Sequence, residues 1–276
     1  MENIINRKFQ IEDVIGNGKF GIVYKGINIR TKEIVAIKTE EEKCIYKLLK
    51  RETTILNHLF QNRCKNIPYI YWYGRYNQLS CLIMTHYEYN LKTFFSNVDV
   101  SQEEIYEMFK KCIRIIESIH KCSIIHRDIK PDNFMIKNDD IYLIDFGLSL
   151  FYRNEDNNHI IHFDEDNIVG TPNYVSYFNH CGEPQSRRDD LLSLGYMCLL
   201  FLNGELQWEN ISCTNSDMSE TSLENPKNKI RKKMKEFNNL QKISNKEMIK
   251  YFDKCYSLCY DDNPDYEQLS NIFNFD

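Results

Sequence analysis

The stretch over residues 126–133 reads HRDIKPDN and places charged and amide side chains at short, fixed spacings. Asp128 could accept the proton of an attacking hydroxyl, and Lys130, two residues later, could neutralise charge on a transferred phosphoryl group. A DFG sequence begins at Asp145, twelve residues after Asn133. Carboxylate and amide oxygens are the ligands that Mg²⁺ or Mn²⁺ prefers, so Asn133 and Asp145 are the predicted metal ligands. The spacing therefore predicts phosphoryl transfer, with Asp128, Lys130 and Asn133 as the catalytic residues.

A glycine-rich segment near the start of the chain could bind phosphates. Residues 16–23 read GNGKFGIV, with Gly16, Gly18 and Gly21 ahead of Val23. This pattern alone is weak, and a simple β-turn is the alternative explanation. A dinucleotide-binding unit would need a helix next, but the following residues alternate like a strand. The segment is therefore predicted to be a hairpin whose tip folds over phosphates through backbone N–H groups.

A lysine on a short β-branched strand supplies the next candidate. Lys38 ends the sequence VAIK, 17 residues after Gly21, and could hold phosphate oxygens as a point charge. Such a lysine needs a carboxylate to keep it aimed, and Glu52, inside an amphipathic helical pattern, is the candidate. Glu40, Glu41 and Glu42 follow the strand directly and are interpreted as a solvated acidic turn.

The elements that must position these groups fall into two kinds. The first 85 residues or so read mainly as strands, with one helix, and the rest is mostly helical, with a hinge expected between the two near residues 85–88. A capping box of Ser101 and Glu104 opens a strongly amphipathic helix. Expected strands cover residues 9–15, 22–24, 34–37, 69–73, 79–84, 134–137 and 141–144. Expected helices include 44–60 and 189–202, and expected loops are 152–168 and 209–228.

Composition bounds the class of protein. The chain has 276 residues, is 42% hydrophobic and 27% charged, and carries a net charge of −5, so a whole-chain basic footprint for nucleic acid is absent. The longest apolar run, residues 191–202, is too short to span a bilayer, and the N-terminus has no signal-peptide pattern. The ten cysteines form no CxxC pair. We expect a cytoplasmic or nuclear protein with reduced thiols that binds neither nucleic acid nor membrane.

Taken together, the motifs resemble the eukaryotic protein kinase superfamily and, within it, the casein kinase I family. The resemblance runs from Phe9 to Phe273. Its most specific part is QSRRDDL at residues 185–191, and SYF at 176–178 stands where most kinases carry A-P-E. Further matching segments are IP at 67–68, YG at 73–74, HRDIKPDNF at 126–134, GT at 170–171, NY at 173–174 and NPDY at 263–266.

The resemblance implies an α+β, two-lobed kinase fold over residues 1–276. A small β-rich N-lobe would cover about residues 1–87 and a larger helical C-lobe about residues 88–276. It further implies ATP as co-substrate, a Mg²⁺ or Mn²⁺ ion, and transfer of the γ-phosphate to Ser/Thr hydroxyls of protein substrates by a monomer. Lys130 is the serine/threonine-type variant of the catalytic loop.

The resemblance also assigns roles around the nucleotide. Met84 would be the gatekeeper, and main-chain groups of Thr85, His86 and Tyr87 would hold adenine. Asp190 would brace the catalytic loop, and Thr171 would bridge Asp128 and Lys130. The apolar walls would be Ile15 and Val23 above, Ala36 at the side, and Met135 or Ile144 below.

Departures from the casein kinase I pattern affect substrate choice. That family reads phosphate or acid upstream of the target with a cluster of basic side chains. Arg127 is present here, but Leu150, Asp166 and Asn173 stand at the other matching positions, and residues 164–166 are all acidic. The family's substrate preference is therefore not carried over.

A basic run over residues 227–235 invites two interpretations. The first is a solvated helix face, and the second is a docking surface for an acidic substrate. The run consists of Lys227, Lys229, Arg231, Lys232, Lys233 and Lys235.

Other function classes remain as alternatives. A pseudokinase scaffold would lack one of Lys38, Asp128, Asn133 or Asp145, and all four are present. A small-molecule phosphotransferase of related fold would be expected to have H-G-D in the loop and no Lys130. The branch similar to vaccinia-related kinases also often shows H-G-D.

Overall fold

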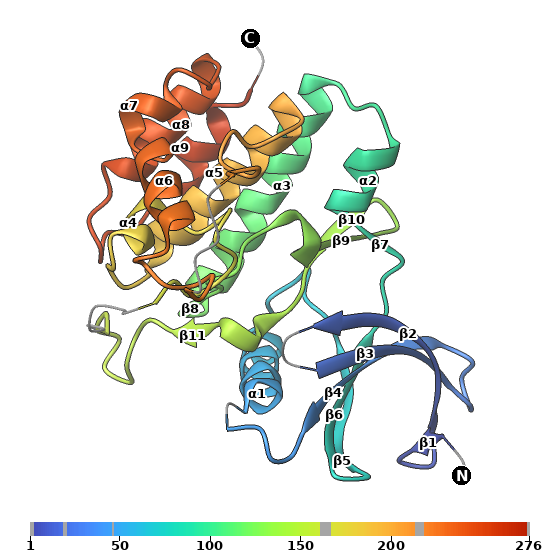
Figure 1. The fold of residues 1–276 in the computed structure, drawn as a ribbon. Coiled ribbons are helices and arrows are strands. Elements are labelled where there is room, and N and C mark those ends of the chain that lie inside the picture. Colours follow the sequence, from blue (N-terminus) through green and yellow to red (C-terminus); the bar gives the residue numbers. More distant parts are fainter. Residues whose placement is uncertain (1–2, 19–20, 46, 161–166, 213–217, 275–276) are drawn as a thin grey trace.

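The computed structural model describes residues 3–18, 21–45, 47–160, 167–212 and 218–274. Figure 1 shows two parts, a β-rich part that contains the N-terminal third of the chain and a larger part made mostly of helices. The predicted α+β class, with a small β-rich lobe and a larger helical lobe, is confirmed. Within the described ranges, no helix is both long and apolar enough to cross a membrane.

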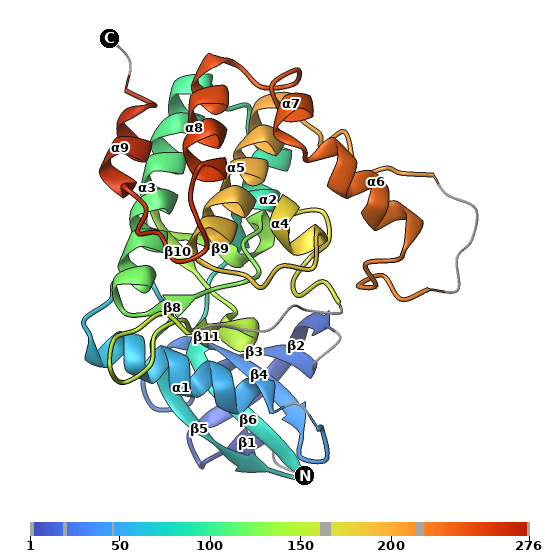
Figure 2. The ribbon, with the colours of Figure 1, turned by 90° about the vertical axis from the view of Figure 1, so that its left-hand side faces the viewer.

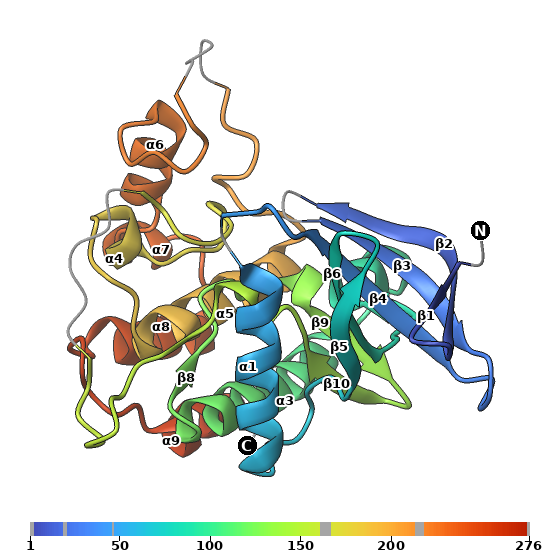
Figure 3. The same ribbon diagram turned by 90° about the horizontal axis from the view of Figure 1, so that it is seen from below.

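The N-terminal part is one antiparallel sheet with a helix alongside it (Figure 3). The strand order is β1-β2-β3-β4-β6-β5, and α1 spans Leu48–Gln61. The strands cover Ile4–Ile5 (β1), Phe9–Gly18 (β2), Gly21–Asn28 (β3), Ile34–Glu41 (β4), Ile70–Tyr76 (β5) and Leu79–Thr85 (β6).

The register of this sheet sets the positions of the predicted site residues. Val23 of β3 lies opposite Lys38 of β4, and Ala36 of β4 lies opposite Met84 of β6. Side chains alternate across a strand, so Ala36 and Lys38 share one face of the sheet. That face packs against α1, whose Leu49 is buried with Ala36 and Met84.

The helical part is built around α5, which spans Arg187–Asn203 and is buried along most of its length. As predicted, α3 (Gln102–Lys121) begins with a capping box of Ser101 and Glu104. The remaining helices are α2 (Leu91–Asn97), α4 (Tyr177–His180), α6 (Pro226–Met234), α7 (Phe237–Leu240), α8 (Lys246–Tyr256) and α9 (Tyr266–Asn271).

Short strands hold the two motif loops between them. The HRD loop lies between β8 (Ile124–Ile125) and β9 (Phe134–Lys137), with a 3-10 turn at Pro131–Asn133. The DFG sequence lies between β10 (Asp140–Leu143) and β11 (Leu150–Phe151), with a 3-10 turn at Phe146–Leu148. Antiparallel pairing of β9 with β10 and of β8 with β11 brings the two loops together. A further two-residue strand, β7 (Tyr89–Asn90), pairs with β9.

Two predicted boundaries are wrong. The first helix begins at Leu48 rather than residue 44. The predicted loop over 209–228 overlaps α6, which begins at Pro226 because the side chain of Asn225 accepts a hydrogen bond from the Lys227 amide and caps the helix.

Candidate active site

The side chains of Asp128, Lys130 and Thr171 form one hydrogen-bonded group. Thr171 donates from Oγ1 to Asp128 Oδ1 at 2.7 Å. Lys130 Nζ lies 2.7 Å from Asp128 Oδ2 and donates to Thr171 Oγ1 at 2.9 Å. Asn133 donates from Nδ2 to the Asp128 carbonyl at 2.8 Å, which leaves its amide oxygen available as a ligand. The structure therefore brings Thr171 together with the three polar residues of the HRD loop, Asp128, Lys130 and Asn133.

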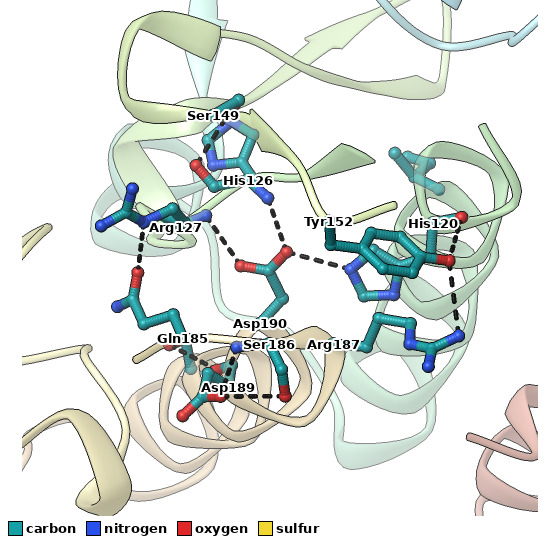
Figure 4. Close-up of polar contacts among 12 residues, drawn as sticks. His120, His126, Arg127, Ser149, Tyr152, Gln185, Ser186, Arg187, Asp189 and Asp190 are labelled. Atoms are coloured by element: carbon teal, nitrogen blue, oxygen red, sulfur yellow. Dashed lines mark hydrogen bonds and ion pairs between the residues drawn. The ribbon is translucent and has the colours of Figure 1, made fainter. Parts of the chain in front are cut away.

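Asp190 fixes the backbone of this loop from the first turn of α5. Its carboxylate accepts hydrogen bonds from the amides of His126 at 2.7 Å and Arg127 at 2.9 Å, and it lies 3.0 Å from Nε2 of His120 (Figure 4). Burial alone would raise the pKa of Asp190, but its hydrogen bonds, above all with His120, hold it below the ordinary value. The group therefore stays a charged acceptor, and the brace predicted for Asp190 is present.

His126 joins the HRD loop to the DFG loop. It is fully buried, and its Nε2 lies 3.0 Å from the carbonyl oxygen of Ile144. Its ring meets the buried ring of Phe146 edge-on, at 4.9 Å between centroids. His126 is thus a packed, hydrogen-bonded histidine, as predicted, and not a group that meets solvent or substrate.

Lys38 connects three elements through two ion pairs. Its Nζ lies 2.7 Å from Glu52 Oε2 on α1 and 2.6 Å from Asp145 Oδ1 at the start of the DFG sequence. Burial would lower the pKa of Lys38, but the two carboxylates outweigh it and hold the pKa above its ordinary value. For Asp145, burial would raise the pKa, and the ammonium of Lys38 instead lowers it to about 2. The lysine and Asp145 are therefore both charged at neutral pH.

Glu40 belongs to the site region, which corrects its interpretation as part of a solvated turn. Its side chain is buried, and Oε1 accepts hydrogen bonds from the amides of Leu48 at 2.9 Å and Leu49 at 3.3 Å. These amides open α1, whose N-cap residue Lys47 makes no side-chain cap. A carboxylate at a helix N-terminus satisfies free N–H groups and interacts favourably with the helix dipole. Strand β4 therefore supplies both the partner of Glu52 and the cap of its helix.

A cavity of about 690 Å³ lies between the two parts of the molecule. Lys38 and Glu52 line it from the N-terminal part, and Asp128 and Asp145 line it from the helical part. Its other lining residues are Gly16, Asn17, Gly21, Val23, Thr39, Glu40, Leu48, Leu49, Lys92, Lys130, Asp132, Asn133, Gly147, Leu148, Thr171, Asn173, Tyr174 and Glu209.

The glycine-rich segment forms the β2–β3 hairpin at one edge of this cavity. Gly21 has φ of +148°, and a Cβ atom there would lie 1.8 Å from the carbonyl oxygen of Thr39. A side chain is therefore excluded at Gly21. Gly16 leaves more room, since a Cβ atom would approach only the side chain of Val23, at 3.6 Å. Gly18 pairs with Gly21 at the end of the hairpin.

The residues predicted around adenine are less closely gathered. Ala36 and Met84 are buried together, with Val23 packed against them, whereas Ile15 is 49% exposed. His86 and Tyr87 line a separate cavity of about 310 Å³. None of residues 84–87 is among the residues that line the 690 Å³ cavity, so their contact with adenine remains a prediction.

The oxygen donors of the site suit a hard cation that is shared with phosphate. No group of three or more His, Cys, Asp or Glu side chains in the described part of the chain is arranged to hold a metal ion. Asn133 and Asp145 offer two oxygen ligands, and Mg²⁺ commonly binds one or two carboxylates together with phosphate oxygens and water. The residues present therefore fit Mg²⁺ in the company of a nucleotide.

The basic run at 227–235 does not form a uniformly solvated face. Lys227, Lys229 and Lys233 are exposed, but Lys235 is fully buried. The acidic segment 164–166, with Asp166, lies outside the described residues. Leu150 lies in β11, and Asn173 accepts a hydrogen bond from Arg231 Nε to Oδ1 at 2.9 Å.

Comparison with protein-family models gives one finding. The model described as the protein kinase domain matches residues 9–271. The match covers both parts of the molecule, from β2 to the end of α9, and includes every predicted site residue.

Proposed function

The chain belongs to the protein kinase family, and we propose that it phosphorylates serine and threonine residues of proteins in the manner of the casein kinase I branch. As a member of that family it is a phosphotransferase with the two-lobed kinase fold. The class of acceptor, the branch, the nucleotide and the metal are parts of the proposal.

The observation that carries the proposal is the hydrogen-bonded group of Asp128, Lys130 and Thr171. Thr171 donates to one carboxylate oxygen of Asp128, and Lys130 lies beside the other. This holds the carboxylate rigidly in the cleft, where it can orient an acceptor hydroxyl and take its proton. Lys130 adds a positive charge at the place where the transferred phosphoryl group gains negative charge.

The opposite wall of the cleft supports ATP as the donor. Glu52 and Asp145 already hold the side chain of Lys38 in place. It can therefore bind phosphate oxygens with little further loss of conformational entropy. At Gly16 and Gly21 the hairpin presents backbone without a side chain to the same cavity. Mg²⁺, held by Asn133 and Asp145, would neutralise charge on the phosphates.

The casein kinase I assignment rests on the segment around α5. Asp190 of the QSRRDDL sequence braces the HRD loop. Ser176, at the position of the missing A-P-E box, caps α4 through a hydrogen bond from the Asn179 amide, and its hydroxyl also contacts Asp189. The departure from the A-P-E pattern is thus built into local structure at the start of α4 and α5.

The test of acceptor class is an assay with radiolabelled ATP on casein, a basic protein and a peptide library that carries Ser, Thr or Tyr at the acceptor position. We expect transfer to Ser and Thr. Asp128→Asn should reduce transfer at least about 100-fold. The matched control is Asp139→Asn, which changes an exposed carboxylate in the β9–β10 turn. Transfer to Tyr alone, or full activity of Asp128→Asn, would overturn the proposal.

A second assay tests how far the branch's substrate preference applies. Two peptides that differ by one phosphoserine three residues before the acceptor are compared at low salt. Of the positions expected to read a phosphate, 127 holds an arginine, whose Nε donates to Gln185 at 2.9 Å. Position 173 holds Asn, which carries no charge. A single exposed charge pair contributes little, so we expect the two peptides to be phosphorylated at similar rates. A strong preference for the phosphorylated peptide would show that other cations complete a phosphate-reading site.

A further inference from the structure

Lys235, directly after α6, is a buried lysine that the chemistry above does not use. Its side chain is 0% exposed. Nζ donates to the carbonyl oxygens of Pro172 at 3.1 Å and Val175 at 2.7 Å, and lies 3.2 Å from Nε2 of His180. Both carbonyls belong to the segment that follows Thr171.

Among the described residues no carboxylate forms an ion pair with this amine, so no opposite charge offsets the free-energy cost of its burial. The nearest aromatic faces are those of Tyr196 and Trp208, with centroids 4.9 and 5.4 Å from Nζ. Burial, with a smaller contribution from Arg231, lowers the pKa of Lys235 well below its ordinary value. An apolar side chain of similar length would fill the space without this penalty, so packing alone does not account for a lysine here.

Trp208 and Arg231 also donate hydrogen bonds to the segment 172–175. Trp208 donates from Nε1 to the carbonyl oxygen of Asn173 at 2.8 Å, and Arg231 donates to the side chain of Asn173. Lys235 and Trp208 together donate to the backbone carbonyls of residues 172, 173 and 175, and Arg231 donates to the side chain of residue 173. Figure 2 shows α6, which carries Arg231 and leads into Lys235, beside α4, which follows this segment.

The gripped segment is continuous with the site. Thr171 is the residue before Pro172, and its carbonyl accepts hydrogen bonds from the amides of Tyr174 at 2.8 Å and Val175 at 3.1 Å. Asn173 and Tyr174 line the same cavity as Asp128. A shift of this turn would therefore move the hydroxyl that bonds Asp128 and Lys130.

We propose that Lys235 is a positioning residue that clamps residues 172–175 and thereby keeps Thr171 bonded to Asp128 and Lys130. The inference rests on the proposed function for its effect on rate, but the clamp itself is a property of the fold. It also gives the region that replaces the A-P-E box an anchor that lies outside α4 and α5.

The first experiment compares Lys235→Met with Lys233→Met, an exposed lysine two residues away on α6. Lys235→Met should lower kcat for peptide phosphorylation by about tenfold or more, because small displacements of positioned groups cost that much or more. KM for ATP should stay within about twofold of wild type. The midpoint of thermal unfolding should change little, because removal of a buried amine offsets the loss of the hydrogen bonds to the carbonyls of Pro172 and Val175. Lys233→Met should match wild type in all three.

A double-mutant cycle separates positioning from general structural damage. If Lys235 acts through Thr171, then Lys235→Met should lower kcat by less than about twofold in a Thr171→Ala background. Effects that simply multiply would overturn the proposal. Trp208→Phe, which removes the indole N–H bond to Asn173 together with part of a buried ring, provides a second variant with the same expected coupling if Lys235→Met proves unstable.

Hydrogen exchange provides a readout that needs no activity. The amides of Tyr174 and Val175 should exchange faster in Lys235→Met than in wild type, whereas those of α3 should not change. Unchanged exchange at these amides, or a fully active Lys235→Met enzyme, would overturn the clamp. An inactive wild-type protein with the expected change in exchange would instead count against the proposed function and leave the clamp supported.

Discussion

At the scale of single residues, the main feature of the site is the contact of Lys38 with two carboxylates. Glu52 is 1% exposed, whereas the side chain of Asp145 is 42% exposed. The lysine therefore pairs with one acid that has no access to water and one that faces the cleft. This asymmetry lets Asp145 take a ligand while Glu52 keeps the lysine in place.

Removing the lysine should affect stability as well as activity. Lys38→Met leaves Glu52 buried without its partner, which should cost about 3 kcal/mol of unfolding free energy. Adding Glu52→Gln should recover most of that stability, while phosphoryl transfer stays down at least about 100-fold in both variants. Urea unfolding and the transfer assay measure the two effects. Unchanged stability of Lys38→Met, or restored activity in the double variant, would contradict this assignment.

The same contact gives a defined pH dependence. The pKa of Asp145 is lowered to about 2, so its stabilising contribution is present above its unfolded pKa of about 4 and is lost as pH falls towards 2. Lys38 has a raised pKa, so its contribution is present below about pH 10 and is lost only in stronger base. Between about pH 5 and 9, neither Lys38 nor Asp145 should therefore contribute a step to the unfolding free energy of the wild-type protein. Burial raises the pKa of Glu52 and Lys38 opposes that rise, so Lys38→Met/Asp145→Asn should gain a dependence on pH at the acid side of this range. A difference curve from urea unfolding across this range is the measurement.

At the scale of elements, the position of α1 depends on Glu40 at the end of β4. The strand pairs with Glu52 through Lys38 and caps the start of α1 through Glu40, so helix and strand are joined at two points. Loss of a helix cap commonly costs about 1 kcal/mol.

Glu40→Ala should therefore destabilise the protein by about 1 kcal/mol and lower phosphoryl transfer, because α1 would hold Glu52 less firmly against Lys38. Glu41→Ala is the matched control, since Glu41 is the next residue on the same strand and is exposed. Chemical unfolding and the transfer assay on both variants decide the matter. Equal behaviour of the two would mean that Glu40 does not support α1.

Sequence patterns predicted the helices and strands better than the contacts that join one element to another. The amphipathic α3 with its capping box follows from local periodicity, and the paired strands β9 and β10 were predicted close to their observed bounds. The start of α1 was not, because its cap comes from Glu40, a residue on a neighbouring element rather than at the N-cap position. Lys235 was missed for the same reason, since a basic run looks solvated until α4, α5 and the 172–175 segment pack around one member.

The candidate site shows the same division. Asp128, Lys130, Asn133 and Asp145 come from short motifs whose spacing carries the chemistry, and the structure gathers them. The positions of the residues predicted to contact adenine depend on how the sheet packs over the cleft, which spacing does not encode. Glu209 lines the cavity without any sequence signal that marks it, whereas Tyr174 was marked only as part of the family match at 173–174.

At the scale of the whole molecule, the cavity is shared by two parts that meet across it. A ligand that touches Lys38 and Asp145 together links those parts and should stabilise both. A nucleotide at 100 times its Kd contributes about 2.7 kcal/mol.

Non-hydrolysable ATP with Mg²⁺ should therefore raise the unfolding midpoint by about 5 °C. EDTA should remove the metal-dependent share of this shift, and Asp145→Asn should lack it in the presence of Mg²⁺. Asp139→Asn should behave like wild type. A full shift for Asp145→Asn would remove Asp145 from the metal site.

The contact between Lys38 and Asp145 also has a consequence for how the protein is made. The two residues are 107 positions apart, whereas Lys38 and Glu52 are separated by only 14. Closing a long loop costs more entropy than closing a short one. Contacts between residues far apart in the sequence therefore form late, unless other contacts have already brought the two segments together. On a ribosome, the N-terminal sheet and α1 can assemble with the Lys38–Glu52 pair already in place. The cleft then stays half-built until residue 190 has emerged to brace the HRD loop. Catalytic competence thus comes later than assembly of the N-terminal sheet, because the residues that position the HRD loop and Thr171 lie in the helical part.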